Sequence, residues 1–205
     1  MIRPRLTFVA GANGSGKTTL TRWNALFMEI PLLDPDAIAN ALQATTSLPP
    51  IAAARQVLKS AAEHLKKSES FAIETTLSGR NYLQMMLDAK ARGFEVRLVY
   101  IGTESVEINL ARIRNRVLAG GHDVPENDVR RRYQRSLENL PIAIKRADDS
   151  ILFDNSTSDG YRLVAILGST GNRWFEPKPS WATGAGLMTF LRSAPKAAPE
   201  ADDQI

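Results

Sequence analysis

A glycine-rich stretch near the amino terminus constrains the fold of this chain more than any other feature. Residues 11–18 read GANGSGKT, which matches the phosphate-binding pattern G-x-x-x-x-G-K-[ST]. The apolar run Leu6–Ala10 before it predicts a buried strand, and the residues from Thr18 onward predict a helix. Because a strand, a glycine loop and a helix start are the context that this motif requires, a chance glycine turn is the weaker interpretation.

Residues 11–18, called the phosphate loop below, have the chemistry of a site for nucleotide phosphates. Glycines let the backbone approach a ligand closely, and the N–H groups of the loop and of the helix start attract anions. We expect ATP and Mg²⁺ as cofactors, with Lys17 on the β- and γ-phosphates and the Thr18 hydroxyl on the metal. The predicted phosphate-binding residues here are Gly11, Ala12, Asn13, Gly14, Ser15, Gly16, Lys17, Thr18 and Thr19.

The composition limits the other kinds of site. The chain has no cysteine, which excludes disulfides, cysteine nucleophiles and thiolate zinc sites, and its two histidines argue against a histidine-rich metal site. No apolar run is long enough to span a bilayer, and the first residues lack the pattern of a secretory leader, so we expect a cytoplasmic protein without a membrane partner. The net charge of +4 suits anionic small molecules and gives little support for nucleic acid.

Predicted strands and helices alternate along the chain. Further strands are predicted at 31–33, 71–76, 95–101, 150–153 and 161–167. Helices are predicted at 35–44, with Asp34 as a possible cap, and at 51–67. Further helices are predicted between a Ser78 cap and Gly93, from Ser105 with Val106, Leu110, Ile113 and Val117 inward, and after the break at 120–125, with a bend near Pro141. This alternation predicts an α/β fold with a mostly parallel sheet and right-handed crossovers.

The carboxyl-terminal part has a different composition. Glycine and proline are frequent from Ser169 onward, and we expect a short docked helix at 187–191. Trp174 and Trp181 are expected to anchor this segment to the core. We predict one domain at residues 1–192, with an arginine-rich, lid-like helical region at 105–147, and a flexible tail at 193–205.

Acidic and hydroxyl residues follow two strands at the edge where a parallel sheet binds its ligand. Asp36 could accept the proton of a substrate hydroxyl as it attacks the γ-phosphate, or it could be a first-turn acid facing the helix dipole. Glu74 ends a buried strand and could orient a substrate hydroxyl or a Mg²⁺-bound water, or it could face solvent. Thr76 could bond the substrate.

Arginines and a histidine gather around the 120–125 break. Arginine side chains stabilise a transferring phosphoryl group, and helices joined by a glycine hinge could close over ATP. We expect two or three of these arginines to contact phosphate and the others to form a solvated basic face. His122 could bond a phosphate oxygen or stabilise its own loop, and Asn155 could frame the adenine or form a turn. The arginines are Arg112, Arg116, Arg131, Arg132 and Arg135.

Taken together, these blocks resemble the zeta-toxin family of P-loop kinases, in order from about residue 5 to 168. The Glu-Thr-Thr-Leu-Ser-Gly block at 74–79 and the Gly-Gly-His-Asp-Val-Pro block at 120–125 are more specific than the phosphate loop. The resemblance implies a P-loop nucleoside-triphosphatase fold of the nucleotide-kinase-like kind, a three-layer sandwich with a five-stranded parallel core. It also implies a kinase that phosphorylates the amino sugar of UDP-N-acetylglucosamine, as toxin of a toxin–antitoxin pair.

The resemblance also implies roles for single residues. Asp36 would be the base, with Lys17, Arg116 and Arg132 as further catalytic groups, and Arg135 and Asn155 would bind ATP. The acceptor, a sugar nucleotide or another hydroxylated metabolite, would contact Asp36, Glu74, Thr76, Arg80 and His122. His122 stands where the toxins use an arginine, and a small helical antitoxin would be the protein partner. Two other hypotheses remain open: an ATP-binding regulatory module, and an RNA-interacting P-loop protein.

Overall fold

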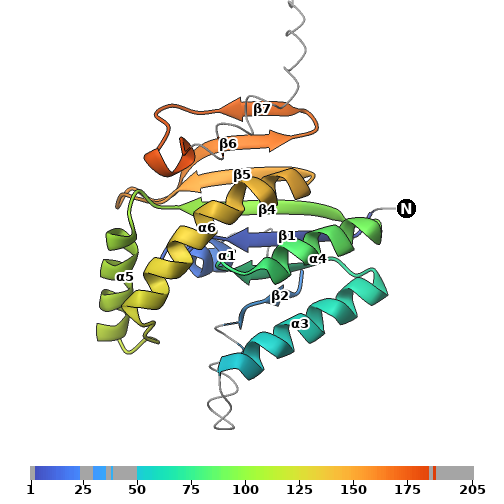
Figure 1. Ribbon diagram of the computed structural model, residues 1–205, viewed down its shortest axis with the longest axis horizontal. Helices are drawn as coiled ribbons and strands as arrows, with labels where there is room; N and C mark the ends of the chain where they lie inside the picture. Colours follow the sequence, from blue (N-terminus) through green and yellow to red (C-terminus); the bar gives the residue numbers. More distant parts are fainter. Residues whose placement is uncertain (1–2, 24–29, 36–37, 39–49, 185–186, 188–205) are drawn as a thin grey trace, which may run out of the picture.

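The computed structural model describes residues 3–23, 30–35, 38, 50–184 and 187. In this part of the chain seven strands form one sheet in the order β2-β3-β1-β4-β5-β6-β7 (Figure 1). The first five strands of this order pair in parallel, and β6 and β7 add an antiparallel edge. The predicted α/β class with a mostly parallel sheet is therefore confirmed. The strands are β1 (Arg5–Ala10), β2 (Leu32–Leu33), β3 (Phe71–Thr75), β4 (Glu95–Gly102), β5 (Asp149–Asp154), β6 (Arg162–Gly168) and β7 (Gly171–Trp174).

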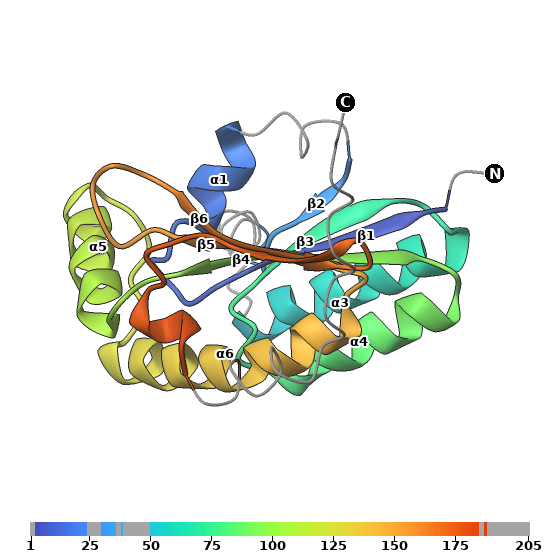
Figure 2. The ribbon, with the colours of Figure 1, turned by 90° about the horizontal axis from the view of Figure 1, so that it is seen from above.

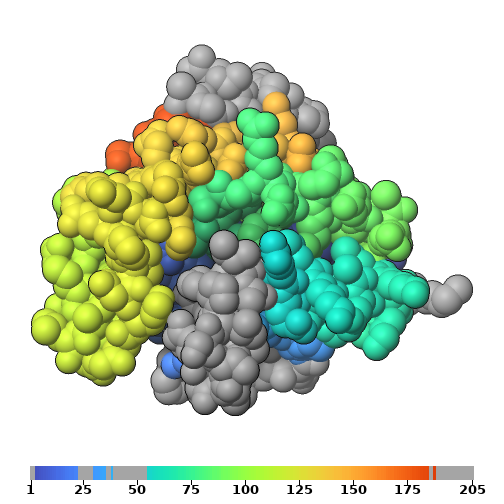
Figure 3. Space-filling view, turned by 60° about the horizontal axis from the view of Figure 1, so that its bottom comes forward, coloured from blue at the N-terminus to red at the C-terminus, as the bar shows by residue number. Residues whose placement is uncertain are grey.

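Helices cover both faces of the sheet (Figure 2). On one face lies α1 (Lys17–Trp23), and on the other lie α3 (Pro50–Lys67), α4 (Arg80–Ala91) and α6 (Glu126–Arg146). The helix α5 (Val106–Leu118) lies beyond the carboxyl ends of the parallel strands. In the space-filling view α3, α4 and α6 form much of one face of the molecule (Figure 3). Among the described residues, no helix has both the length and the apolar character needed to cross a membrane.

The two faces of β1 enter two hydrophobic clusters because successive strand residues point to opposite sides. Leu6 and Phe8 are fully buried in the larger cluster, together with residues of α3, α4 and α6. Val9 belongs to a smaller cluster on the α1 side, against which Leu20 packs. With both faces covered, the strand is held rigidly, and so is the phosphate loop that follows it.

Two local predictions need correction, and one strand was missed. Ser78 was predicted to cap α4, but the residue at the cap position is Gly79. The Ser78 hydroxyl pairs with that of Thr76 at 2.9 Å and does not cap the helix. The apolar stripe of α5 ends at Ile113: Val117 is 37% exposed and is not part of the cluster beneath that helix. The strand β7 was not predicted, because its residues take strand form by pairing with β6 and not by an apolar pattern of their own.

Other predictions fall on parts of the chain outside the described residues. Most of the predicted helix at 35–44, most of the short helix at 187–191 and the flexible tail at 193–205 are among them, while Pro35 and Ile38 are described and helical. Leu187 is described and is 3% exposed, in contact with the main core.

Trp181 anchors the segment after β7 to the sheet, as the sequence predicts. It lies in a 3-10 turn, η2 (Ser180–Ala182), and its side chain is 7% exposed. The indole N–H donates to Asp154 Oδ1 at 2.9 Å, and the ring packs on Tyr100 with 5.6 Å between centroids. The ring also covers Gly102, where an added Cβ would lie 2.3 Å from it.

Because Trp181 fills this space, Trp181→Ala should lower the free energy of unfolding by about 3–5 kcal/mol. Urea unfolding followed by circular dichroism measures the change. The control is Trp174→Ala on the edge strand β7, where the side chain is only half-buried and the loss should be clearly smaller. Equal losses in the two variants would contradict the anchoring role.

Candidate phosphate-binding site

A pocket of about 780 Å³ opens at the carboxyl edge of the sheet. The phosphate loop, which joins β1 to α1, forms one wall, including Asn13, Gly14, Gly16 and Lys17. The other walls come from α5 and from the turn between β5 and β6. The loop, α5 and this turn therefore meet where a parallel sheet binds its ligands, although they are far apart in the sequence.

The phosphate loop has the backbone that its sequence predicts. Gly11, Gly14 and Gly16 all have positive φ, at 148°, 78° and 105°. The Lys17 ammonium lies over the loop and donates to the carbonyl oxygens of Gly11 at 2.9 Å and Ala12 at 3.1 Å. Since α1 starts at Lys17, its amino-terminal N–H groups face the same region, which favours an anion.

Glu74 lies directly beside the phosphate loop. It is 3% exposed at the end of β3, which pairs in parallel with β1, so both strands deliver their ends to one place. Its carboxylate accepts hydrogen bonds from the hydroxyls of Thr18 at 3.0 Å and Thr21 at 2.6 Å. Burial raises the pKa of the Glu74 carboxyl, the bond from Thr21 opposes the rise, and the negative charge of Asp34 adds to it. The solvent-facing interpretation of Glu74 is therefore wrong.

The donor set around Thr18 fits a hard cation such as Mg²⁺. Hard cations take oxygen ligands, and Mg²⁺ keeps several waters while using one or two carboxylates and substrate phosphates. The Thr18 hydroxyl and the buried Glu74 carboxylate are oxygen donors of this kind, 3.0 Å apart. No group of three acidic, histidine or cysteine side chains suited to a metal occurs among the described residues. A cation here would therefore depend on phosphate oxygens and water for its other ligands.

Glu74→Gln should raise stability while it lowers activity. Removing a buried charge should increase the free energy of unfolding by about 1 kcal/mol near neutral pH, in the absence of Mg²⁺ and nucleotide. The gain should shrink toward pH 4.5, because the raised pKa means that the wild-type carboxyl becomes neutral there. Urea titrations between pH 4.5 and 7.5 test this, and the loss of an outer-shell carboxylate should lower turnover about 10- to 100-fold.

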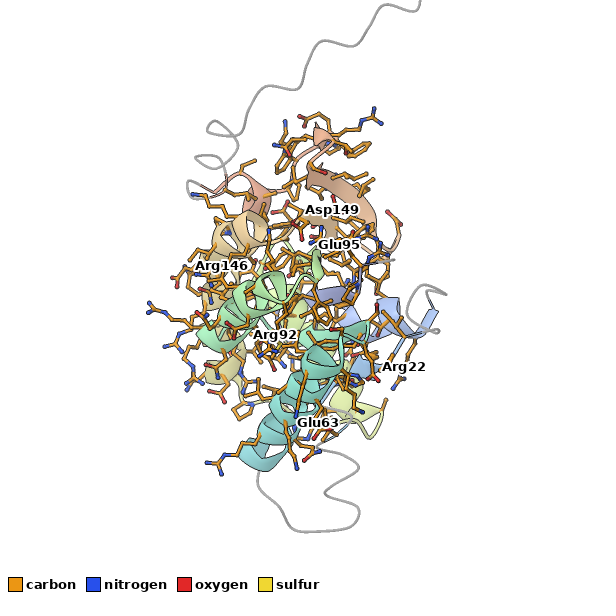
Figure 4. The ribbon with its side chains drawn as sticks, turned by 90° about the vertical axis from the view of Figure 1, so that its right-hand side faces the viewer. Arg22, Glu63, Arg92, Glu95, Arg146 and Asp149 are labelled. Carbon is orange, nitrogen blue, oxygen red and sulfur yellow. The ribbon has the colours of Figure 1, made fainter. Side chains whose placement is uncertain are left out.

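The control for this variant is Glu63→Gln. Glu63 is exposed on α3, away from α1 (Figure 4), so its replacement should change the unfolding free energy by less than about 0.5 kcal/mol. If Glu74→Gln is less stable than the wild-type protein at every pH, the expectation is wrong. The hydrogen bonds from Thr18 and Thr21 would then outweigh the cost of burying the charge of Glu74 in the ligand-free protein.

The predicted arginines divide into three groups. Arg112 and Arg116 line the pocket, donating to the carbonyl oxygens of Thr157 at 3.4 Å and His122 at 2.7 Å. Arg132 does not line the pocket and donates to Asn13 Oδ1 at 3.3 Å. Arg131 pairs with Asp128 at 2.7 Å on the surface of α6, as expected for a solvated basic face.

The other predicted residues are only partly brought together. His122 and Asn155 line the pocket, and so does Asp34. Arg80 and Arg135 are exposed on α4 and α6, and neither they nor Thr76 line the pocket. Asp36, the predicted base, lies outside the described residues.

Two residues at the site were missed in the sequence, Asn109 and Tyr161. Asn109 is fully buried, and its amide donates to the Asn13 carbonyl oxygen at 2.6 Å. The Tyr161 hydroxyl donates to the Gly16 carbonyl oxygen at 2.7 Å. The sequence does hold a signal for Asn109. It lies three residues after Val106 and four before Ile113, so this polar residue falls on the predicted buried face of the helix and needs a partner there. For Tyr161 the sequence holds no such signal.

The seven-stranded sheet, the glycine loop and the buried acid beside it define a P-loop kinase-like domain. The AAA_33 family model, described as an AAA domain, matches residues 6–140, and the chain belongs to this family. A relative in Haemophilus influenzae, an uncharacterized protein, is 40% identical over 134 residues, which are 65% of this chain and 95% of the relative.

Solved structures share the fold at low sequence identity. The AvrRxo1-ORF1:-ORF2 structure with ATP has a TM-score of 0.68 at 16% identity, over 84% of this chain and 60% of that chain. The PezAT toxin–antitoxin structure of Streptococcus pneumoniae has a TM-score of 0.56 at 20% identity, over 81% of this chain and 72% of that chain. At these identities the likeness establishes the fold and leaves the reaction to be argued from the site.

Proposed function

We propose that this protein is an Mg²⁺- and ATP-dependent kinase that transfers the γ-phosphate to a hydroxyl of a small metabolite. The observation that carries the proposal is the meeting of Lys17, Thr18 and Glu74 at the phosphate loop, on the edge of a pocket of about 780 Å³. A cation-binding hydroxyl, a buried carboxylate and a loop ammonium are the groups that phosphoryl transfer needs at its donor side.

The residues have separate roles in this proposal. The loop N–H groups bind the β-phosphate, and Lys17 turns from the carbonyls of Gly11 and Ala12 to the β- and γ-phosphates. Thr18 would hold Mg²⁺ directly and Glu74 would hold it through water, and the cation would neutralise charge on the phosphate oxygens. Arg112 and Arg116 supply positive charge from the opposite wall of the pocket.

The acceptor that we favour is UDP-N-acetylglucosamine, with Asp36 as the base that takes the proton of the attacking hydroxyl. This choice rests on the resemblance of residues 74–79 and 120–125 to the zeta toxins. The acceptor would be held by Thr76, Arg80 and His122, of which His122 lines the described pocket, and Arg132 and Arg135 on α6 would clamp the phosphates. The fold shared with the PezAT toxin–antitoxin structure and the AvrRxo1-ORF1:-ORF2 complex supports a toxin with a protein partner.

The test incubates purified protein with labelled ATP, Mg²⁺ and a panel of sugar nucleotides and simple sugars. We expect one phosphorylated sugar nucleotide, and we expect Asp36→Asn to keep ATP binding and lose transfer. Transfer to another metabolite would show that the acceptor is not a sugar nucleotide, and it would still support a kinase. Protein that binds ATP but phosphorylates nothing would favour the regulatory module, and strongly salt-dependent RNA binding would favour the RNA-interacting alternative.

A further inference from the structure

Three side chains from outside the phosphate loop each hold one carbonyl oxygen of the loop. Asn109 of α5 donates to the oxygen of Asn13 at 2.6 Å. Asn155, directly after β5, donates to the oxygen of Ser15 at 2.8 Å, and Tyr161, directly before β6, donates to that of Gly16 at 2.7 Å. Three of the four peptide groups between Asn13 and Lys17 are thus fixed by partners distant in sequence.

A fixed carbonyl also fixes the N–H of the same peptide group. A trans peptide is planar, and its C=O and N–H point in opposite directions. Holding the oxygens of Asn13, Ser15 and Gly16 therefore turns the N–H groups of Gly14, Gly16 and Lys17 away from Asn109, Asn155 and Tyr161 respectively. Because Gly14, Gly16 and Lys17 line the pocket, these are the N–H groups that can meet a phosphate.

We propose that Asn109, Asn155 and Tyr161 are positioning residues that set the phosphate loop in its anion-binding arrangement before the nucleotide arrives. The inference rests on the proposed function, since it assumes that the loop binds phosphate. N–H donors that are already aligned need no reorganisation when the phosphate binds. The binding free energy is therefore not reduced by the cost of ordering the loop.

Two of the three positioning side chains, those of Asn109 and Tyr161, are themselves firmly held. Asn109 is fully buried, and its Oδ1 accepts the Thr103 hydroxyl at 2.5 Å, so the amide cannot rotate away from the loop. Thr103 follows β4, and its carbonyl oxygen accepts the Tyr133 hydroxyl from α6 at 2.7 Å. The Tyr161 ring packs edge-on against Phe153 of β5, with centroids 6.4 Å apart. Burial raises the pKa of the Tyr161 hydroxyl, so it stays a donor at neutral pH.

The close fit of the loop against these three residues, through the backbone of Asn109 and the side chains of Asn155 and Tyr161, is a second, independent sign. An added Cβ at Gly14 would lie 2.7 Å from the carbonyl oxygen of Asn109. At Gly16 it would lie 2.5 Å from Asn155 Nδ2 and 2.9 Å from the Tyr161 hydroxyl. The loop glycines are therefore required by the positioning residues as well as by a ligand.

Tyr161→Phe is the sharpest test, because it removes one hydroxyl and keeps the ring. The probes are ATP and inorganic tripolyphosphate, each titrated by calorimetry with Mg²⁺. We expect both dissociation constants to rise about five- to tenfold, which is the worth of one hydrogen bond. In ligand-free protein, ¹⁵N relaxation should show increased motion at the Lys17 amide in this variant, and at the Gly14 amide in Asn109→Leu.

The control is Tyr100→Phe, which also removes a buried tyrosine hydroxyl, but one that bonds Ser136 at 3.1 Å and not the loop. It should leave both dissociation constants and the loop amides unchanged. Weaker ATP binding with unchanged tripolyphosphate binding in Tyr161→Phe would make Tyr161 a base-contacting residue and overturn the inference. Unchanged loop amides would overturn it as well. Failure of the wild-type protein to bind either probe would overturn the proposed function itself.

Discussion

Lys17→Met should lower the rate of phosphoryl transfer by about a thousandfold, since it removes the one loop side chain whose charge can follow the γ-phosphate. The ammonium lies 2.9 and 3.1 Å from the Gly11 and Ala12 carbonyl oxygens, so it is already at the loop and needs only to rotate onto a ligand. Methionine is also unbranched and flexible but carries no charge, and α1 should therefore form as before. Initial rates with saturating ATP and acceptor measure the loss.

Lys66→Met is the matched control. Lys66 is exposed near the end of α3, outside the pocket, so its removal should leave the rate within about twofold. Circular dichroism of both variants should be that of the wild-type protein. If Lys17→Met transfers phosphate at a tenth of the wild-type rate or faster, Lys17 is not a catalytic residue.

Gly16→Ala should weaken ATP binding by about a hundredfold. The loop conformation needs φ of 105° at this position, which costs a residue with a Cβ about 1–2 kcal/mol. The new methyl would also lie 2.5 Å from Asn155 Nδ2 and 2.9 Å from the Tyr161 hydroxyl, displacing two hydrogen bonds of about 1 kcal/mol each. Together these costs are about 3 kcal/mol, or two powers of ten in the dissociation constant.

Gly79→Ala controls for the loss of a glycine as such. Gly79 precedes α4 with φ of −108°, and nothing lies within 4 Å of a Cβ added there. This variant should bind ATP as the wild-type protein does, and titration calorimetry compares the two. If Gly16→Ala kept the wild-type affinity, the loop could adopt another binding conformation and the described one would not be the functional one.

The parts of the fold that the sequence predicts are those determined locally. The phosphate loop is a continuous motif whose glycines must take unusual dihedrals, and the structure places them at positive φ. The buried strands are continuous apolar runs, and they are recognisable because a parallel sheet covered on both faces demands such runs. Gly93, at φ of 83°, ends α4 as predicted for the same local reason.

The parts that the sequence does not predict depend on contacts between distant residues. Glu74 could be placed at a strand end, but only the pairing of β3 with β1 brings it to Thr18. Tyr161 has no local pattern that points to Gly16, because its role depends on the antiparallel return of β6. The strand β7 exists through its partner β6, and its own residues carry no strand pattern.

The distances in sequence between the phosphate loop and its positioning residues bear on how the protein is made. The loop is translated before its hydrogen-bond partners, which follow 96, 140 and 145 positions later in the chain. Chains emerge from the ribosome amino terminus first, and contacts between distant residues form only after both have emerged. A nascent chain that carries the whole glycine motif should therefore acquire its full affinity for nucleotide late, once β6 has joined the sheet.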